Sequence, residues 1–246
     1  MTGNIAIEVA ISTLANSMRL YGEAQMRFAD LFGVDREEAI NNVDRAFEAK
    51  LEAFHTLFDV SKAIFPYFDH GDTAILIAIR NAIHHRDHPL FRSLYARLLL
   101  DEDAARWRGA ALLLATYPTL HGAPIMMQHF VRMDDVDARL DPDVASPHLD
   151  ASMKAPKVRQ RFELIDGELA LGAIRANATR ERYPGDQVYL DLMPIFTSAV
   201  VRVFKAMKAI GIRFRGFDAE AYSVPFTTEI EVDLGRPTFQ AFRVGG

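Results

Sequence analysis

The stretch Ala74-Ile75-Leu76-Ile77-Ala78-Ile79-Arg80-Asn81-Ala82-Ile83-His84-His85 decides how this chain is interpreted. Its first six residues are all apolar, as expected of a helix buried in a protein core. The same segment then ends in an arginine, an amide and two histidines. Because buried charged and imidazole groups need partners or a functional role, this change of character marks a candidate functional site.

Two long helices are predicted ahead of this stretch. Apolar residues recur at helical spacing over about residues 4–32 and again over about 36–62. Asp35, with Glu38 three residues later, is typical of the start of a helix. A third helix then carries the apolar stretch. Since Pro89 disfavours helical geometry at the residue before it, we expect this helix to end between His85 and His88.

The rest of the chain is predicted to be mostly helical as well. A fourth helix is expected over residues 90–100, and a fifth from Asp101 or Asp103 to about residue 117. Three prolines interrupt residues 134–157, which therefore suit an exposed loop or linker. Further helices are expected over about 158–182 and 187–210, with Gly211 as the cap of the second.

The C-terminal tail changes character. Residues 228–234 alternate between polar and apolar side chains, which predicts a short strand. Residues 238–244 could pair with that strand, or the tail could dock on the helices or on a second copy of the chain. Taken together, the patterns predict a mainly α protein with a short β tail.

The composition excludes several classes of function. The chain has 246 residues, of which 50% are hydrophobic and 25% charged, as in ordinary globular proteins. It contains no cysteine, so disulfides, thiol nucleophiles, iron–sulfur clusters and cysteine zinc sites are excluded. A net charge of −5 does not suggest a general nucleic-acid coat, although a basic groove can still exist locally.

We expect neither a signal peptide nor a membrane span. Residues 1–20 lack a basic leading region, and their first charged residue is Glu8. The longest uncharged run, residues 109–131, contains two prolines, two glycines and two histidines, and therefore suits a turn between packed elements better than a membrane span. A cytoplasmic protein is the simplest interpretation.

Arg80, Asn81 and His85 form an Arg-Asn-x3-His motif. This spacing resembles the signature of the HEPN superfamily, whose active members are metal-independent ribonucleases. The order of the elements adds to the resemblance, because two long helices precede a short apolar helix that ends in the motif. The resemblance covers roughly residues 4–117, and residues 158–246 have no counterpart that we can name.

The resemblance implies a fold and a set of partners. It implies an up-and-down helical bundle over residues 1–117, followed by a connecting region over 118–157. Additional helices and the strand tail over 158–246 would pack on this bundle. Two protomers would form a homodimer that brings two motifs into one cleft for an RNA substrate. Such proteins commonly serve as toxins or in antiviral defence, so an antitoxin or a sensor protein is a further implied partner.

The residue types suit RNA cleavage without a metal or a cofactor. RNA supplies its own nucleophile, the 2′-hydroxyl, so the protein must move protons and stabilise negative charge. Histidine titrates near neutral pH and can transfer these protons. The guanidinium of Arg80 can bind phosphate oxygens, while Asn81 could orient either side chain or contact the sugar.

Two histidines compete for the catalytic role. His85 is favoured because Arg-x4-His is the family spacing, and His84 and His88 are then auxiliary. On a regular helix, residues five apart point about 140° away from each other, whereas residues four apart lie nearly above one another. Arg80 and His85 would therefore converge only if the last turn loosens or if two chains assemble the site.

Other interpretations of the same histidines stay open. Histidine, asparagine and arginine also end helices simply because they suit the helix C-terminus. His84 and His88 are four residues apart and could bind a metal, with Asp87 or His85 nearby, in a helical metal-binding protein. A non-catalytic helical module that binds RNA or a protein partner is a further alternative.

Motifs for other enzyme classes are incomplete or missing. Glu52 and His55 form a Glu-x-x-His motif on the second helix, but di-iron bundles need two copies and the sequence has one. We therefore expect His55 to lie at a helix surface or boundary. A Gly-rich phosphate loop followed by lysine is missing, and so is the Gly-x-Ser-x-Gly motif of serine hydrolases.

A basic stretch near the C-terminus is a second candidate for RNA contact. Between Asp191 and Asp218 the sequence has no acidic residue. It carries five cations there: Arg202, Lys205, Lys208, Arg213 and Arg215. With Phe214 and Phe217 nearby, these side chains could follow an RNA backbone. A solvated helix face opposite an apolar one is the preferred interpretation.

Overall fold

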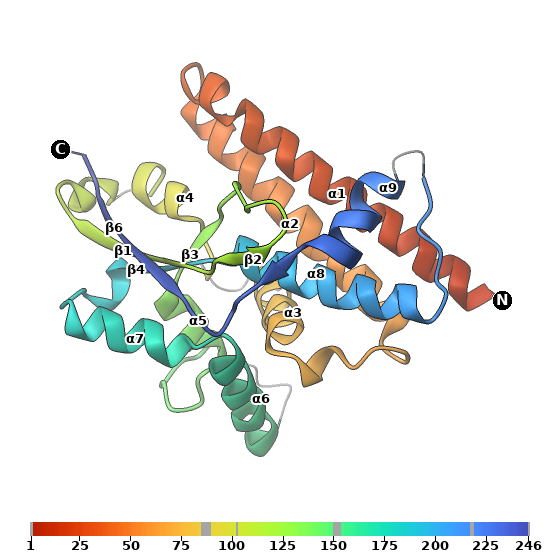
Figure 1. Cartoon of the computed structure of the whole chain (residues 1–246). Coiled ribbons are helices and arrows are strands. Elements are labelled where there is room, and N and C mark those ends of the chain that lie inside the picture. Colours follow the sequence, from red (N-terminus) through yellow and green to blue (C-terminus); the bar gives the residue numbers. More distant parts are fainter. Residues whose placement is uncertain (1, 85–89, 102, 150–153, 217–218, 246) are drawn as a thin grey trace. The chain divides into compact units, whose positions relative to one another are not determined.

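The computed structural model describes residues 2–84, 90–101, 103–149, 154–216 and 219–245 (Figure 1). The protein is mainly helical, as predicted, and its described strands form one four-stranded and one two-stranded sheet. The chain divides into two compact units, each assembled from three separate segments. Unit 1 comprises Met1–Tyr67, Thr119–Met127 and Phe196–Val232, and unit 2 comprises Phe68–Pro118, Gln128–Ile195 and Asp233–Gly246.

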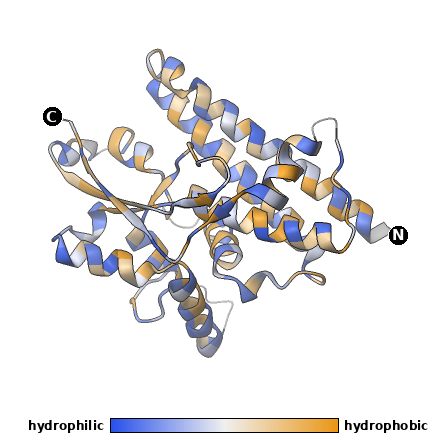
Figure 2. Cartoon of the chain, in the orientation of Figure 1, coloured by the Kyte–Doolittle hydropathy of each residue, from blue (hydrophilic) through white to orange (hydrophobic). Residues whose placement is uncertain are grey.

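Unit 1 is built around a long helical hairpin. Its two arms, α1 (Thr2–Phe32) and α2 (Arg36–Ser61), lie side by side and confirm the two helices predicted first (Figure 1). Asp35 caps α2, because its carboxylate accepts a hydrogen bond from the backbone N–H of Glu38 at 2.9 Å. Hydrophilic and hydrophobic colours alternate along both helices, as expected where one stripe of each helix is buried (Figure 2).

The remaining elements of unit 1 come from later in the chain. They are the part of α8 (Leu192–Ala209) from Phe196 onward, α9 (Ala219–Val224), the π-helical turn η4 (Pro225–Glu229), and the antiparallel strands β2 (Thr119–His121) and β5 (Glu231–Val232). Gly211, at φ +82°, ends α8 as predicted, and the N–H of Ile212 bonds back to the carbonyl of Met207. Position 122 requires glycine for two reasons. Its φ is +88°, and a Cβ there would lie 3.0 Å from backbone atoms of Glu229 and Ile230, which directly precede β5.

A lysine lies in the core of unit 1. Lys50 on α2 is 1% exposed, and its Nζ lies 3.7 Å from the centre of the Tyr21 ring. The rings of Phe47 and Phe196 lie 4.4 Å from the same nitrogen. Aromatic rings attract cations at such distances, and the attraction grows when water is excluded. Lys50 is therefore held in an aromatic cage formed by α1, α2 and α8.

In unit 2, the candidate motif lies on α3 (Gly71–His84), which follows the short turn η1 (Tyr67–Asp69). The N–H of Gly71 donates to the Glu168 carboxylate at 2.7 Å, so the last residue of α6 (Ala155–Glu168) caps α3. A Cβ at Gly71 would come within 2.9 Å of Leu169 and 3.2 Å of the Ile165 backbone. A glycine there lets α3 and α6 approach closely.

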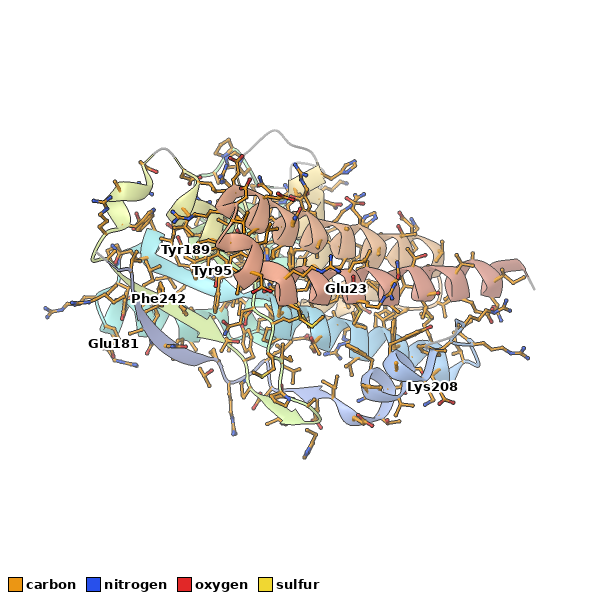
Figure 3. All side chains as sticks on the ribbon, turned by 90° about the horizontal axis from the view of Figure 1, so that it is seen from above. Glu23, Tyr95, Glu181, Tyr189, Lys208 and Phe242 are labelled. Atoms are coloured by element: carbon orange, nitrogen blue, oxygen red, sulfur yellow. The ribbon has the colours of Figure 1, made fainter. Side chains whose placement is uncertain are left out.

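The four-stranded sheet of unit 2 has the order β3-β4-β1-β6. These strands are β3 (Phe130–Arg132), β4 (Val188–Asp191), β1 (Ala111–Thr116) and β6 (Thr238–Arg243). β1 pairs with β4 in parallel, and the other two pairs are antiparallel. The edge strand β6 is exposed along its length, including Phe242, whereas Tyr189 on β4 is fully buried. Both residues are labelled in Figure 3.

The sheet corrects the prediction of a fifth helix up to residue 117. The chain instead forms α4 (Leu94–Leu99), the short turn η2 (Ala104–Trp107) and then β1. Leu112, Leu113, Leu114 and Ala115 are all buried, so this strand is covered on both faces. A short continuous apolar run of this kind has no period that separates a buried strand from a buried helix.

Three further predictions about unit 2 need correction. The helix expected over 158–182 is two helices, α6 and α7 (Leu171–Arg180), which are separated by Ala170 at φ +46°. The helix expected from residue 187 begins only at Leu192, after η3 (Gly185–Gln187) and β4. The stretch expected to be a loop, 134–157, contains most of α5 (Met133–Leu140) and the first turn of α6.

The tail forms strands, but they do not pair with each other. β5 pairs with β2 in unit 1, and β6 pairs with β1 in unit 2. The sequence left open whether residues 238–244 pair with the first tail strand, dock on the helices or dock on a second copy. This segment instead contains β6, which pairs with β1 of the same chain. Within the described ranges, the helices all fall short of the length and apolar character that a bilayer span demands.

Candidate functional site

The candidate site lies at the C-terminal end of α3. The helix is buried from Gly71 to Ile79, and Arg80 and Asn81 are its first half-buried residues. A guanidinium nitrogen of Arg80 (Nη1) donates to the Asn81 Oδ1 at 3.2 Å. The structure therefore brings together two of the three predicted catalytic side chains, at the point where a core helix reaches the surface.

The histidines of the motif are described only in part. His84 is the last residue of α3 and is exposed. His85 and His88 lie outside the described residues, and so does Asp87. The predicted convergence of Arg80 with His85, and the proposed metal pair of His84 with His88, therefore stay predictions.

The ends of α3 suit the helix dipole. Asp72 lies in the first turn, where negative charge is favoured, and His84 lies in the last turn, where positive charge is favoured. This placement is compatible with the simpler interpretation, in which the motif merely ends a helix. The Arg80–Asn81 hydrogen bond is the feature that goes beyond that interpretation, because ending a helix does not require it.

The alternative metal sites gain no support from the described residues. No group of three or more histidine, aspartate or glutamate side chains lies close enough together among them to hold a metal ion. On α2, the Nδ1 of His55 lies 3.3 Å from a carboxylate oxygen of Asp59, and its ring packs against Phe58. His55 is thus half-buried, between the core side and the solvent side of α2, as expected from the sequence.

The basic stretch is partly engaged within unit 1. The Nε of Arg215 lies 2.5 Å from a carboxylate oxygen of Glu8, and Lys208 donates to the hydroxyl of Thr227 at 3.0 Å. Lys205 and Arg213 are exposed, and Arg202 is half-buried. The opposite side of α8 is fully buried at Val200, Val203, Phe204 and Met207. This arrangement favours a solvated helix face over a continuous RNA-binding surface.

A buried carboxylate in unit 2 was missed by the sequence analysis. Asp135 on α5 is completely buried, and one of its oxygens accepts from Arg97 at 2.7 Å and from the N–H of Phe91 at 3.0 Å. Its other oxygen accepts from Arg132 at 2.8 and 3.2 Å. The Asp135 network therefore joins α5 and β3 to α4 and to the segment that precedes α4.

Tyr189 lies within range of the charges of the Asp135 network. Its side chain is fully buried, and its hydroxyl has no hydrogen-bond partner among the described residues. Burial raises the pKa of Tyr189 to about 12, although the positive charges of Arg97 and Arg132 act in the opposite direction. The hydroxyl is closed off from solvent, so we assign the network a structural role.

A second ion network fixes α5 against its neighbours. Arg175 on α7 contacts the carboxylates of Asp137 and Asp166, each at 2.5 Å. Burial alone would lower the pKa of Arg175, but hydrogen bonds and charge from the two carboxylates raise it.

The spacing of Met133, Val136 and Leu140 is the sequence pattern that indicates α5, because it places three apolar residues on one helix face.

Comparison of the chain with models of known protein families, with curated proteins and with solved structures finds no match. The resemblance to HEPN ribonucleases remains a prediction carried by Arg80, Asn81 and His85.

Proposed function

We propose that this chain is a metal-independent endoribonuclease that cleaves single-stranded RNA and acts as a homodimer. The observation that carries the proposal is the hydrogen-bonded pair of Arg80 and Asn81 at the surface end of a core helix. The sequence places two histidines, His84 and His85, three and four residues after Asn81. The same proposal includes a HEPN-like helical bundle and an antitoxin or sensor protein that restrains the enzyme.

The proposed reaction uses the nucleophile of the substrate. His85 removes the proton of the 2′-hydroxyl, whose oxygen then attacks the adjacent phosphorus. Arg80 stabilises the negative charge that develops on the phosphate oxygens. The bond to the 5′-oxygen breaks, and a protonated histidine supplies the proton of the leaving group. The products are a 2′,3′-cyclic phosphate and a 5′-hydroxyl.

Asn81 has a positioning role in this proposal. Its carbonyl oxygen accepts from Nη1 of Arg80, which fixes the orientation of the guanidinium. An arginine held in this way loses less side-chain entropy when it binds phosphate. Asn81→Ala should therefore weaken cleavage less than Arg80→Ala does, mainly through a slower chemical step.

A dimer could bring Arg80 and His85 together although they diverge on a single helix. α3 stays helical through His84, and residues five apart on a regular helix point about 140° away from each other. A second protomer can offer its own His85 to Arg80 across a two-fold axis. We therefore propose that each catalytic centre combines the Arg80 of one protomer with the His85 of the other.

The first test is RNA cleavage in excess EDTA. We expect end-labelled single-stranded RNA to be cut by the wild type, and the rate to fall about 100-fold or more in Arg80→Ala and His85→Ala. His84→Ala shows which imidazole acts. Arg106→Ala is the matched control, because Arg106 belongs to the same unit, is about half exposed and pairs with Asp103.

The outcomes separate the proposed functions. Cleavage that EDTA abolishes would contradict the metal-free mechanism, and cleavage that survives both Arg80→Ala and His85→Ala would contradict the site. RNA that is bound but left uncut would favour the non-catalytic binding module instead.

A mixing experiment tests the shared site. Arg80→Ala and His85→Ala should each be inactive alone. In a heterodimer of the two variants, one of the two centres is intact, because one chain supplies Arg80 and the other supplies His85. An equal mixture should therefore recover about a quarter of the wild-type rate. If differently tagged chains co-purify and so demonstrate subunit exchange, a mixture that recovers no activity would place each centre within one chain.

A further inference from the structure

Unit 1 contains a cavity that the proposed nuclease site does not use. Its volume is about 500 Å³, within the range typical of small-molecule sites. One wall is α1, which contributes Ser12, Asn16 and Arg19 among others. Further lining comes from Arg215, Tyr222 and Phe226 near the C-terminal end of the unit.

The charged side chains that line the cavity are both arginines. The described lining residues include Arg19 and Arg215 but no aspartate or glutamate. Asn16 accepts a hydrogen bond from Nη2 of Arg19 at 2.7 Å. The Nε of Arg19 lies 4.0 Å from a carboxylate oxygen of Glu23. Because a guanidinium has five N–H groups, these contacts orient Arg19 and still leave donors for a ligand.

Arg215 is held in a similar way. Its Nε faces the carboxylate of Glu8, whose side chain is only 6% exposed, whereas the Arg215 side chain is 54% exposed. The backbone carbonyl of Arg215 also accepts from the hydroxyl of Tyr222 at 2.7 Å. Both guanidiniums thus face carboxylates that lie outside the lining, Glu23 and Glu8, and an anion is the ligand group that matches their remaining donors.

The rest of the lining favours a flat ring. Tyr222 and Phe226 belong to an aromatic cluster around Phe204, with ring centres 6.2 and 6.1 Å from it. Met18 and Met127 also line the cavity. Aromatic edges and methionine sulfurs both make favourable contacts with aromatic rings.

We infer that this cavity binds a small molecule with a flat aromatic body and one anionic group. Arg19 and Arg215 bind the anion, and Tyr222 and Phe226 contact the ring. The inference is independent of the proposed nuclease, because none of these residues belongs to the motif on α3.

The test uses two probes of similar shape but different charge. 8-Anilinonaphthalene-1-sulfonate is an anionic aromatic molecule, and N-phenyl-1-naphthylamine is its neutral counterpart. Titration of each probe into the full chain, followed by fluorescence, should give one site per chain for the anion. Binding of the neutral probe should be about tenfold weaker or more.

Variants assign the site. Arg19→Gln should weaken binding of the anionic probe about tenfold, whereas Arg27→Gln, an exposed arginine of α1 outside the lining, should leave it unchanged. Ala15→Phe should fill the cavity and weaken both probes. Arg215→Gln is a second charge variant, which requires a melting curve as well because it leaves the buried Glu8 without this partner.

Several outcomes would overturn the inference. Equal affinity for the two probes would refute the role of the arginines, and equal losses in Arg19→Gln and Arg27→Gln would refute the location. Binding of several probe molecules per chain, or none, would refute a single site. Displacement of the anionic probe by butanesulfonate as readily as by naphthalenesulfonate would refute the preference for a ring.

Discussion

The two units bury charge in different ways. In unit 1, the ammonium of Lys50 is enclosed by the rings of Tyr21, Phe47 and Phe196. In unit 2, the carboxylate of Asp135 is enclosed by two arginines and a backbone N–H. Both side chains are at most 1% exposed.

The aromatic contacts of Lys50 and the hydrogen bonds of Asp135 differ in how directional they are. Lysine has a long apolar stem that packs like any core side chain, and its attraction to rings tolerates small shifts. The Asp135 network consists of hydrogen bonds between charged groups, which need particular distances and angles. Loss of one partner there leaves other buried charges uncompensated. We therefore expect unit 2 to be far more sensitive to loss of its buried charge than unit 1.

The largest effect is expected from Asp135→Ala. Removing the carboxylate leaves the partly buried guanidiniums of Arg97 and Arg132 without their negatively charged partner. This should lower the free energy of unfolding by about 3–5 kcal/mol. Urea denaturation followed by circular dichroism measures the change. Glu163→Ala is the control, since Glu163 is an exposed carboxylate on α6 of the same unit and its loss should cost less than about 0.5 kcal/mol. Similar losses in both variants would contradict the special role of the network.

Lys50→Met should have a smaller effect. Methionine keeps most of the volume and the apolar stem, so the free energy of unfolding should stay within about 1.5 kcal/mol of the wild type. Lys50→Ala should cost about 2–5 kcal/mol, because it opens a cavity inside the aromatic cage. If Lys50→Met proved as damaging as Asp135→Ala, the charge of Lys50 would carry the stability and the contrast between the units would disappear.

Tyr189→Phe should have the smallest effect near neutral pH. The variant removes a buried hydroxyl that has no hydrogen-bond partner among the described residues, so stability should change by less than about 1 kcal/mol or rise. Alkaline pH should separate the two proteins. Burial raises the pKa of Tyr189 to about 12, whereas tyrosine in the unfolded chain ionises near pH 10.

The sign of the pH effect follows from that order. The protonated hydroxyl is favoured in the folded state, so its contribution to stability is complete below pH 10 and is lost as the pH rises towards 12. Urea midpoints measured from pH 9 to 11.5 should therefore fall more steeply for the wild type than for Tyr189→Phe. Parallel curves would show that the hydroxyl reaches solvent.

Local patterns in the sequence predicted the helical hairpin well. α1 and α2 carry long apolar stripes. The cap of α2 is also local, because the Asp35 carboxylate accepts from the N–H of Glu38, only three residues later. The pairing of Arg80 with Asn81 is also local, since the two residues are adjacent. How Arg80 relates to His85 stays a prediction.

Non-local features could not be predicted in the same way. β1 is a strand because its partners are β4 and β6, and both lie far away in the sequence. The apolar run Leu112–Ala115 would suit a buried helix equally well without them. The Asp135 network depends likewise on Arg97, which is 38 residues away, so its members look like ordinary surface charges in the sequence.

The pairing of β1 with β6 has a consequence for synthesis of the protein on the ribosome. Thr116 and Thr238 are partners at one end of the ladder, although they are 122 residues apart. During translation, β1 must therefore wait for more than a hundred later residues before its edge is covered. An uncovered hydrophobic strand invites pairing with other nascent chains. The growing polypeptide should thus depend on chaperones until β6 has emerged.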